Sequence, residues 1–314
     1  MDFSTNLISI IINALVSLSF LSLATLGIVL IFKTSSTTNF AQGMLGIFGA
    51  YLTSYLIDNK GISELTGMPS VIISSPLQLI LPIIGGMVTS FVFGYLIDAI
   101  IFRNAKYTNA ATKQIITMGL VIVLTGLIPT IFDGVIRRAS FQFVTRTVEI
   151  LGVATPLHGI ITLIIAFFII SLIFIFLKYT KWGLGVRSVA SNERVAGLMG
   201  VNTNFINAMS WAIAGALGAL SAITYTAAIN TLSITAMTPI QINAFYASIL
   251  GGFQTFFGPL VGAFALTLGQ NIIPRILSIW NLATWSDTIL YLVIMLIVLI
   301  KPNGLFGKKV MKKV

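Results

Sequence analysis

Very few residues of this chain could carry out acid–base or metal chemistry. The 314 residues include one histidine, His158, and no cysteine. The only ionisable residue well inside an apolar stretch is Asp98, close enough to Arg103 to pair with it. A lone histidine without thiolates or a carboxylate cluster does not make a zinc site, so we interpret His158 as structural. The sequence therefore predicts no catalytic residue, no metal site and no cofactor on this chain.

The shortage of buried charge also limits how transport by this chain could be driven. Proton-coupled carriers usually place carboxylates or lysines in a cavity between their helices, whereas Asp98 lies near the end of its apolar run. The chain also lacks the G-x-x-x-x-G-K-[ST] loop that binds ATP phosphates. These absences argue against a proton-driven carrier and against ATP binding through such a loop, and they leave sodium coupling through backbone carbonyls open.

Amides and small residues form the second group that could have a function. The stretch "TTNFAQGMLGIFGAYL" places glycines at a spacing of three, which lets helices pack closely. Stripes of this kind either only pack helices together or also surround a pathway for a solute. Buried amides likewise either join helices or line such a pathway. The candidate pathway residues are Asn39, Phe40, Gln42, Gly43, Gly46, Gly49, Gln241, Asn243, Gly251, Gly252, Gln254 and Gly258.

The elements that would position these residues are membrane helices. The chain is 57% hydrophobic and 8% charged, which leaves too little polar surface for a soluble globule. Runs of roughly 20 apolar residues recur, enough to cross a hydrocarbon core of about 30 Å, and they do not alternate as barrel strands would. We expect an all-α, polytopic transmembrane bundle in one domain, 1–314. The predicted segments are 7–32, 40–57, 77–102, 115–132, 158–177, 208–230, 242–257, 259–273 and 286–300.

Two of these nine segments, 242–257 and 259–273, are too short to cross a membrane comfortably. The stretch "GGFQTFFGP" between them disfavours a continuous helix. We therefore expect a broken or re-entrant pair and eight or nine membrane segments in total. Pro82 and Pro274 mark further positions where irregular helix is expected. The first segment lacks the charged start and the cleavage site of a signal peptide, so we interpret it as a retained helix.

The positive charge indicates which loops face the cytoplasm. The net charge is +10, and basic residues at membrane edges usually set orientation at the lipid surface rather than bind nucleic acid. If the short pair makes two passes, most of the 18 basic residues fall on one side. The loop 178–207 and the basic tail 301–314 are then cytoplasmic, and the loop 133–157 is extracytoplasmic. A re-entrant hairpin would satisfy the same distribution.

Within the loop 178–207, the stretch "SNERVAGLMGVN" is typical of a short helix from Ser191 to Gly200. Ser191 or Asn192 can cap its start by accepting hydrogen bonds from unpaired backbone amides. Glu193 in the first turn interacts favourably with the helix dipole. Gly200 can end the helix in a left-handed conformation.

Val195, Leu198 and Met199 form a narrow apolar stripe on this short helix. A helix of about two turns is marginal alone, so the stripe needs a surface to pack against. One such surface is the membrane face or the chain's own bundle. The second is a groove on a cytoplasmic partner, with Arg187 and Arg194 steering the encounter.

Four stretches together resemble the branched-chain amino-acid (Liv-type) ABC importer permeases. They are "TTNFAQGMLGIFGAYL", "WGLGVRSVASNERVAGLMGVN", "ASILGGFQTFFGPLVGAFAL" and "KPNGLFGK". They lie in the order that the family shows and cover about a fifth of the chain. The resemblance implies a permease subunit in the plasma or inner membrane, which imports a small polar solute by alternating access and is not itself an enzyme. Branched-chain or other amino acids are the expected solutes.

The resemblance also implies partners. These are cytoplasmic ABC ATPase subunits, a second permease subunit, identical or not, and an extracytoplasmic solute-binding protein. The loop 178–207 then contains the helix that contacts an ATPase. The family positions matched there are Trp182, Gly183, Arg187, Ala196, Leu198, Met199, Gly200 and Asn202; Ser191, Asn192, Glu193, Arg194 and Val195 complete the predicted coupling residues.

The chain departs from the family pattern beside the expected pathway. Gln42 stands where the family usually has histidine, Met44 where it often has an acid, and Gln254 with Thr255 where it has glycine and serine. The solute therefore stays open, because related permeases carry urea or short amides. An apolar helical chain of this kind could also be a secondary transporter or channel that works alone, or a scaffold that transports nothing.

The loop 133–157 is the predicted docking surface for the solute-binding protein. It contains Arg137, Arg138 and Arg146.

Overall fold

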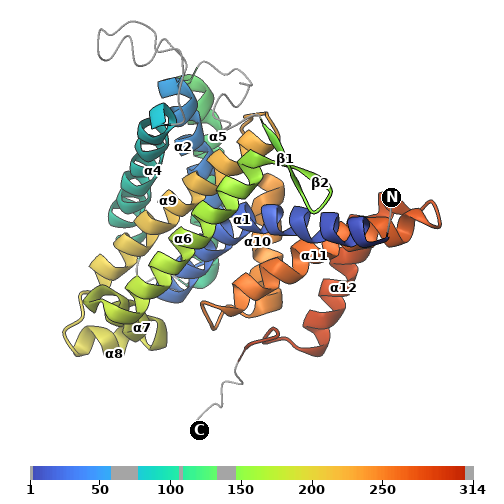
Figure 1. Ribbon diagram of the computed structural model, residues 1–314. Helices are drawn as coiled ribbons and strands as arrows, with labels where there is room; N and C mark the ends of the chain where they lie inside the picture. Colours follow the sequence, from blue (N-terminus) through green and yellow to red (C-terminus); the bar gives the residue numbers. More distant parts are fainter. Residues whose placement is uncertain (1–2, 58–76, 106–108, 133–145, 308–314) are drawn as a thin grey trace, which may run out of the picture.

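A computed structural model describes residues 3–57, 77–105, 109–132 and 146–307 of the chain. These residues form a helical bundle with one small hairpin of strands (Figure 1). Arg137, Arg138 and the lysines beyond residue 307 lie outside the described residues. The elements are α1 (Phe3–Ser35), α2 (Gln42–Ile57), α4 (Leu77–Ile97), η1 (Asp98–Phe102), α5 (Ala110–Ile131), β1 (Thr147–Ile150), β2 (Val153–Pro156), α6 (Leu157–Tyr179), α7 (Lys181–Ser191), α8 (Glu193–Leu198), α9 (Thr203–Ala228), α10 (Thr238–Gly251), α11 (Gly258–Ser278), η2 (Ala283–Trp285) and α12 (Ser286–Ile300).

The predicted all-α polytopic bundle is confirmed. Among the described residues, seven helices are long and apolar enough to cross a membrane: α1, α4 with η1, α5, α6, α9, α11, and η2 with α12. Helices α2 and α10 have only 16 and 14 residues, so each reaches across part of a bilayer. The antiparallel hairpin β1–β2 was not expected, because the sequence predicts only a loop there.

The structure corrects two expectations about the broken pair. The break itself is confirmed, since α10 ends at Gly251 and α11 begins at Gly258. However, α11 is 21 residues long and not short. It continues through Pro274, just as α4 continues through Pro82. Near Pro82, the Thr53 hydroxyl of the neighbouring α2 donates a hydrogen bond to the Pro82 carbonyl at 3.2 Å, which ties α2 to α4.

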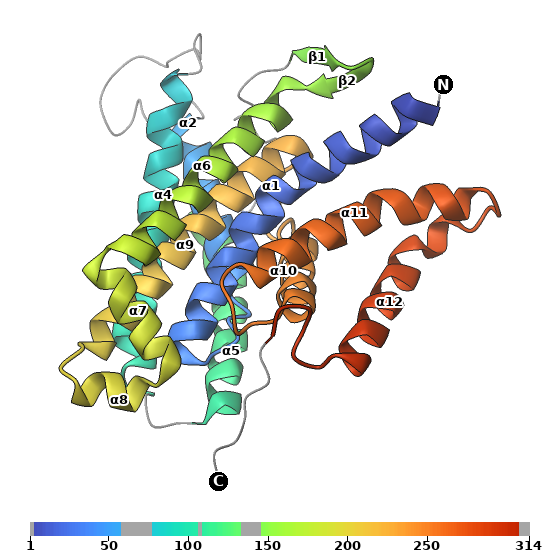
Figure 2. The ribbon, with the colours of Figure 1, turned by 60° about the horizontal axis from the view of Figure 1, so that its bottom comes forward.

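Helix α9 lies at the centre of the bundle and packs against α1, α2 and α4 (Figure 2). Small residues bring these backbones close together. A Cβ added at Gly46 of α2 would lie 2.4 Å from the Gly218 carbonyl oxygen of α9. A Cβ added at Gly215 would lie 2.2 Å from the Ser90 carbonyl oxygen of α4. These glycines are required because backbone, not side chain, fills the space beside them.

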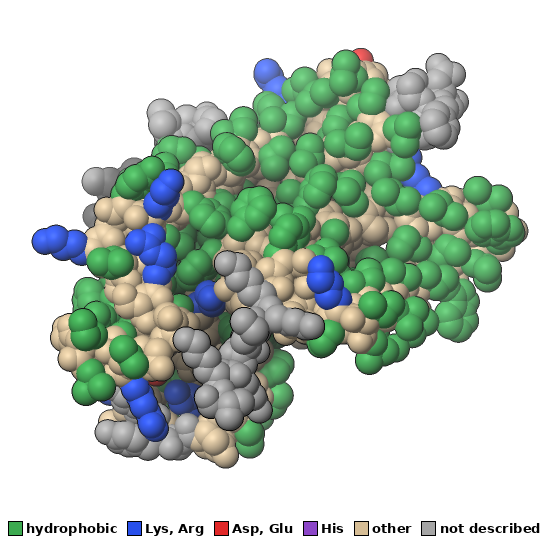
Figure 3. Space-filling model, turned by 90° about the horizontal axis from the view of Figure 1, so that it is seen from below, with side chains coloured by type: hydrophobic (Ala, Val, Ile, Leu, Met, Phe, Trp, Pro, Cys, Tyr) green, Lys and Arg blue, Asp and Glu red, His purple; other side chains and the backbone are tan. Residues whose placement is uncertain are grey.

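Helices α7 and α8 and the described end of the chain lie at one end of the bundle, opposite the β-hairpin (Figures 1 and 2). The C-terminal end of α1 reaches the same place, where the Lys33 ammonium donates to the Gln254 carbonyl at 2.6 Å. Viewed onto this end, lysine and arginine side chains stand out on the surface and acidic ones are nearly hidden (Figure 3).

Candidate functional site

Helix α2 begins near the middle of the bundle and not at its edge. After α1 ends, residues 36–41 run back between the helices. The Phe40 amide donates to the Thr117 hydroxyl of α5 at 3.2 Å. The Gln42 side chain donates to the Ala214 carbonyl at 2.6 Å, and Ala214 lies near the middle of α9. The first turn of α2 is therefore enclosed by protein on several sides.

Helix α10 begins at the same place. Its Gln241 side chain accepts a hydrogen bond from the Gly43 amide at 2.6 Å and donates to the Phe40 carbonyl. The segment before α10 is anchored in the bundle by Leu232 and Met237, which are almost fully buried, while Thr235 and Thr238 are exposed. The starts of two short helices are thus in direct contact, an arrangement that transporters with discontinuous helices use to bind solutes.

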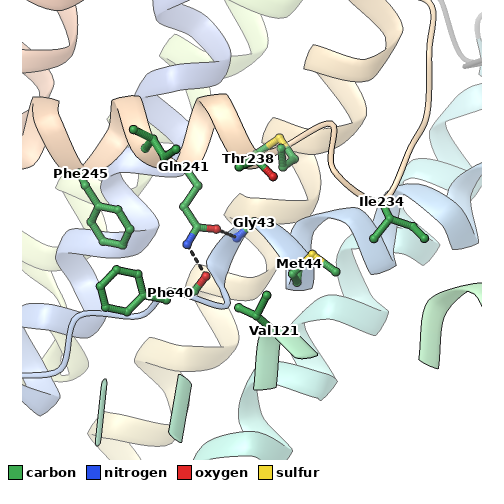
Figure 4. A pocket seen from close by; sticks show the side chains of 10 residues that line it. Phe40, Gly43, Met44, Val121, Ile234, Thr238, Gln241 and Phe245 are labelled. Atoms are coloured by element: carbon green, nitrogen blue, oxygen red, sulfur yellow. Dashed lines mark hydrogen bonds between the residues drawn. The ribbon is translucent and has the colours of Figure 1, made fainter. Parts of the chain in front are cut away.

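A pocket of about 180 Å³ lies between these two helix starts and α5 (Figure 4). The rings of Phe40 and Phe245 lie side by side along it, with centroids 5.1 Å apart. Its polar groups are the Gln241 amide and the Thr238 hydroxyl, and none of its lining side chains carries a charge. The remaining lining residues are Gly43, Met44, Val121, Ile234, Met237 and Ile242. Such a pocket can hold an apolar group and offer hydrogen bonds at one wall.

The structure brings together three of the predicted pathway residues. Phe40, Gly43 and Gln241 all line the pocket. Asn39 and Gln42 are buried but face elsewhere: the Asn39 amide donates to the Gln42 side chain at 3.2 Å, and Gln42 bonds α9 as described above. Gln42 therefore joins α2 to α9, and Asn39 makes local bonds to Ala41 and Gln42 at the start of α2.

Other predicted pathway residues lie in helix contacts. Gly46 packs on α9, and Gly49 packs on α4 and α9. The Asn243 side chain accepts a hydrogen bond from the Tyr291 hydroxyl at 2.9 Å, so it ties α10 to α12. None of the three lines the pocket. The sequence reasoning missed the apolar lining residues, since nothing distinguishes a lining isoleucine from the many others in such an apolar chain.

The glycines of the break lie at the far end of α10. Gly252 has φ +92°, a conformation that L side chains rarely adopt. The Leu305 amide donates to the Leu250 carbonyl at 2.7 Å, and the Phe306 amide donates to the Gly251 carbonyl at 3.2 Å. The "KPNGLFG" stretch is therefore in direct contact with "GGFQ". Its backbone amides bond to the last carbonyls of α10, where that helix ends.

The remaining two pathway candidates belong to this same end. Gly258 starts α11, and a Cβ added there would lie 2.4 Å from the Gly251 carbonyl oxygen. Gln254 is exposed in the connection between α10 and α11. The break is thus a packing junction in this conformation, separated from the pocket by the length of α10.

In the loop 178–207, the structure adds a helix that the sequence did not predict, α7. The Thr180 hydroxyl caps it by accepting from the Gly183 amide at 3.0 Å. The Arg187 guanidinium donates to the Leu177 carbonyl at 2.8 Å, at the end of α6. Trp182 packs on Phe176 with ring centroids 5.4 Å apart. Trp182, Gly183 and Arg187 therefore hold α7 against α6.

Helix α8 matches the short helix predicted from the sequence. Asn192 is its cap and accepts from the Val195 amide at 3.1 Å. Of the two predicted caps, Ser191 and Asn192, it is therefore Asn192 that caps α8, while Ser191 belongs to α7. Gly200 has φ +86° and ends the turn, as expected. Asn202 caps the next helix, α9, by accepting from the Phe205 amide at 3.1 Å.

The apolar stripe of α8 has no packing partner within the described part of the chain. Leu198 is 87% exposed, Met199 80% and Val195 52%. Only Ala196 of this helix is buried. The stripe therefore does not fold against its own bundle, which leaves the membrane face and a groove on a partner as its two predicted surfaces, and Arg194 is exposed beside it.

His158 and Asp98 also have clear surroundings. His158 lies at the start of α6, and its ring lies 3.3 Å from the Thr224 carbonyl of α9, in agreement with a structural role. Asp98 is 4% exposed at the end of α4. Within the described ranges, no group of three or more histidine, aspartate or glutamate residues is placed to hold a metal ion.

Residues 10–299 match a family described as "Branched-chain amino acid transport system / permease component". The chain belongs to this family. It is a permease subunit of an ABC transporter, and not an enzyme. Permeases of this family work with ATPase and other permease subunits.

Similar proteins agree with this assignment. The permease protein BraD of a high-affinity branched-chain amino acid transport system of Pseudomonas aeruginosa is 22% identical and covers 97% of both chains. A probable branched-chain amino acid transport permease, LivH of Methanocaldococcus jannaschii, is 25% identical over 94% of this chain and 91% of its own. The ribose import permease RbsC of Haemophilus influenzae is 24% identical over 76% and 72%. No solved structure matches significantly.

Proposed function

We propose that this permease imports a small amino acid with an apolar side chain, and that the solute passes through the pocket between α2 and α10. The observation that carries this proposal is the composition of the pocket, which is apolar apart from one amide and one hydroxyl. An aliphatic side chain would pack between Phe40, Val121 and Ile242. The positive ends of the two helix dipoles favour the carboxylate of the amino acid nearby.

A sugar fits this pocket less well, although a ribose permease is among the similar proteins. A sugar ring carries several hydroxyl groups, and each loses hydrogen bonds to water unless the protein replaces them. Thr238 and Gln241 are the only polar side chains in the lining. Urea or a short amide could bond to Gln241, but it would leave the apolar walls unused.

For coupling to ATP hydrolysis, we propose that α8 inserts its exposed stripe into a groove on a cytoplasmic ATPase subunit. An amphipathic helix with one exposed apolar face commonly binds in this way. This end of the bundle, with the chain's C-terminus, would face the cytoplasm, in line with its exposed basic residues. A second permease subunit would complete the channel, and a solute-binding protein would dock at the opposite end, near Arg146.

Uptake by the reconstituted transporter tests the solute. The chain is purified with its own ATPase subunits and binding protein, and uptake of labelled leucine, ribose and urea into liposomes is measured. We expect uptake of leucine that requires ATP. Uptake of ribose or urea instead, or transport by the chain without any ATPase, would contradict the proposal.

A matched pair of variants tests the pocket. Val121→Phe fills the pocket and is expected to abolish leucine uptake. Ile122→Phe changes the neighbouring residue, which is 75% exposed on the outside of α5 and does not line the pocket, and should transport normally. Equal uptake by both variants would show that the solute does not pass through the pocket.

A further inference from the structure

The end of α4 widens into a π-helical turn, η1. The Arg103 amide donates to the carbonyl of Asp98, five residues earlier, at 2.8 Å. The Phe102 ring stacks on Trp211 of α9 with centroids 4.6 Å apart. The Asp98 side chain is buried at the start of this turn. Single π turns are uncommon and frequently occur at functional sites, because one extra residue in the turn can be redistributed.

Asp98 belongs to a cluster of charged and polar side chains from five parts of the chain. The cluster surrounds a cavity of about 20 Å³ between α8, η1 and the ends of α1, α5 and α9. It contains two acids and two bases. Its members, which we name the polar junction, are Ser35, Asp98, Phe102, Arg103, Lys113, Glu193, Asn204 and Asn207.

Glu193 brings α8 into this junction. Its carboxylate accepts a hydrogen bond from the Asn207 amide of α9 at 3.2 Å. On the other side, the Lys113 ammonium of α5 donates to the Ser35 carbonyl at 3.5 Å. Helix α8 otherwise packs on α7 and α9. Among the described residues, its connection to the ends of α4 and α5 is therefore this cluster of charges.

The junction is not fully satisfied in this conformation. The Asn207 side-chain oxygen is buried and has no hydrogen-bond partner among the described residues. A buried acceptor without a donor is unfavourable by about 1–3 kcal/mol. It would be satisfied if a nearby donor moved toward it. The junction has two acids, two bases and the unpaired Asn207 oxygen, so its members could form a second set of hydrogen bonds and ion pairs in another conformation.

We propose that the polar junction transmits movement of α8 to the membrane helices, with Asp98 and Glu193 as positioning residues. This inference rests on the proposed contact of α8 with an ATPase. When α8 is displaced, Glu193 leaves the junction, and Arg103 and Lys113 then act on Asp98 alone. The carboxylate and the π turn shift in response. Helix α4 carries the shift to α2, since Gly86 and Gly49 are in backbone contact, and the start of α2 forms one wall of the pocket.

A double-mutant cycle tests this coupling in the assembled transporter. Glu193→Gln and Asp98→Asn are made singly and together, and leucine uptake per ATP hydrolysed is measured. Each single variant should lower this ratio about 3- to 10-fold, and the double variant should lower it little further, because both remove the same connection. The control is Asp287→Asn, which makes the same acid-to-amide change at an exposed residue of α12 outside the junction and should leave the ratio unchanged.

Two further variants keep the outcomes separable. Asn207→Ala removes the bond to Glu193 without changing a charge, and it should lower the ratio even if Asp98→Asn fails to fold. Leu198→Glu should detach the ATPase subunits. If Leu198→Glu leaves them bound, the proposed role of α8 fails. If it detaches them but Glu193→Gln, Asp98→Asn and Asn207→Ala all keep the normal ratio, only the polar junction is excluded.

Discussion

The first turn of α2 and the helix α8 each have a side-chain amide that hydrogen-bonds to the backbone at the helix start. They differ in burial, because the start of α2 is enclosed and α8 is exposed. In α2, the amide comes from a distant helix, since Gln241 of α10 bonds to Gly43 and Phe40. In α8, it comes from the preceding residue, Asn192. Every side chain of the first two turns of α2 is buried, whereas Leu198 of α8 is 87% exposed.

This difference separates two ways of using a short helix. The start of α2 is held by tertiary hydrogen bonds and close backbone contacts, so it can form a fixed wall of a pocket. Helix α8 is formed by local capping and is held mainly through the cluster around Ala196. Apart from Ala196, its apolar side chains are largely exposed and gain little from the rest of the described chain. A partner surface would therefore stabilise α8, while α2 needs none.

The exposed face of α8 gives the largest expected effect. Leu198→Glu places a charge in the centre of the proposed ATPase contact and should lower affinity by at least about 2 kcal/mol, roughly 30-fold. Co-purification of the ATPase subunits and ATP-dependent uptake should both be lost. The matched control is Leu151→Glu in the β-hairpin at the opposite end, where leucine is 74% exposed. If Leu151→Glu releases the ATPase equally well, α8 is not the contact.

Substitutions at two glycines test how tightly α2 packs on α9. Gly46→Val puts a side chain where the Gly218 backbone lies and should destabilise the protein by about 3 kcal/mol or more, by overpacking. Gly119→Val in α5 is the control, because no atom lies within 4 Å of its added Cβ. Thermal unfolding in detergent should separate them clearly. Similar melting temperatures would mean that α2 is not tightly packed on α9.

Removal of the bridge between α10 and α2 has an intermediate effect. Gln241→Leu keeps the size of the side chain but leaves the Gly43 amide and the Phe40 carbonyl without their partner, which should lower stability by about 2–4 kcal/mol. Uptake should fall as well, because the pocket wall loosens. If Gln241→Leu melts at the normal temperature and transports normally, the bridge does not hold the pocket wall.

The local cap of α8 gives the smallest effect. Asn192→Ala should destabilise α8 by about 1 kcal/mol and weaken ATPase binding modestly, with global unfolding almost unchanged. Ser191→Ala, one residue earlier, should have no effect on α8. Hydrogen exchange of the α8 amides measures this directly. Equal exchange in both variants would remove the distinction between a local and a tertiary cap.

The sequence allowed prediction of features that depend on composition or local pattern. The apolar runs predicted the membrane helices, and "SNERVAGLMG" predicted α8 with its cap and its apolar stripe. The local sequence pattern did not predict α7, because the hydrogen bond from Arg187 that holds it against the end of α6 is a tertiary contact. The length of α11 was also missed, since Pro274 suggested an irregular position whereas the helix continues through it.

The pocket was predictable only in part for the same reason. Gly43 and Gln241 are a small and a polar residue at the starts of predicted segments, and Phe40 lies beside Gly43 in the same motif. These residues are in contact only because residues 36–41 turn back into the bundle, and no local sequence pattern predicts that turn. Asn39 and Gln42 carry the same amide group as Gln241, and only the fold shows that Asn39 bonds locally, that Gln42 bonds α9, and that neither lines the pocket.

Labelling of a cysteine in the pocket tests the central claim, that solute passes between the starts of α2 and α10. The chain has no cysteine, so Thr238→Cys gives a single reactive site in the pocket lining. The assembled transporter is labelled in liposomes with a membrane-impermeant maleimide added outside or inside, with and without ATP and leucine. Alternating access predicts labelling from one side in one nucleotide state and from the other side in the other state, with leucine slowing both. Labelling that is insensitive to nucleotide and to leucine would contradict the claim.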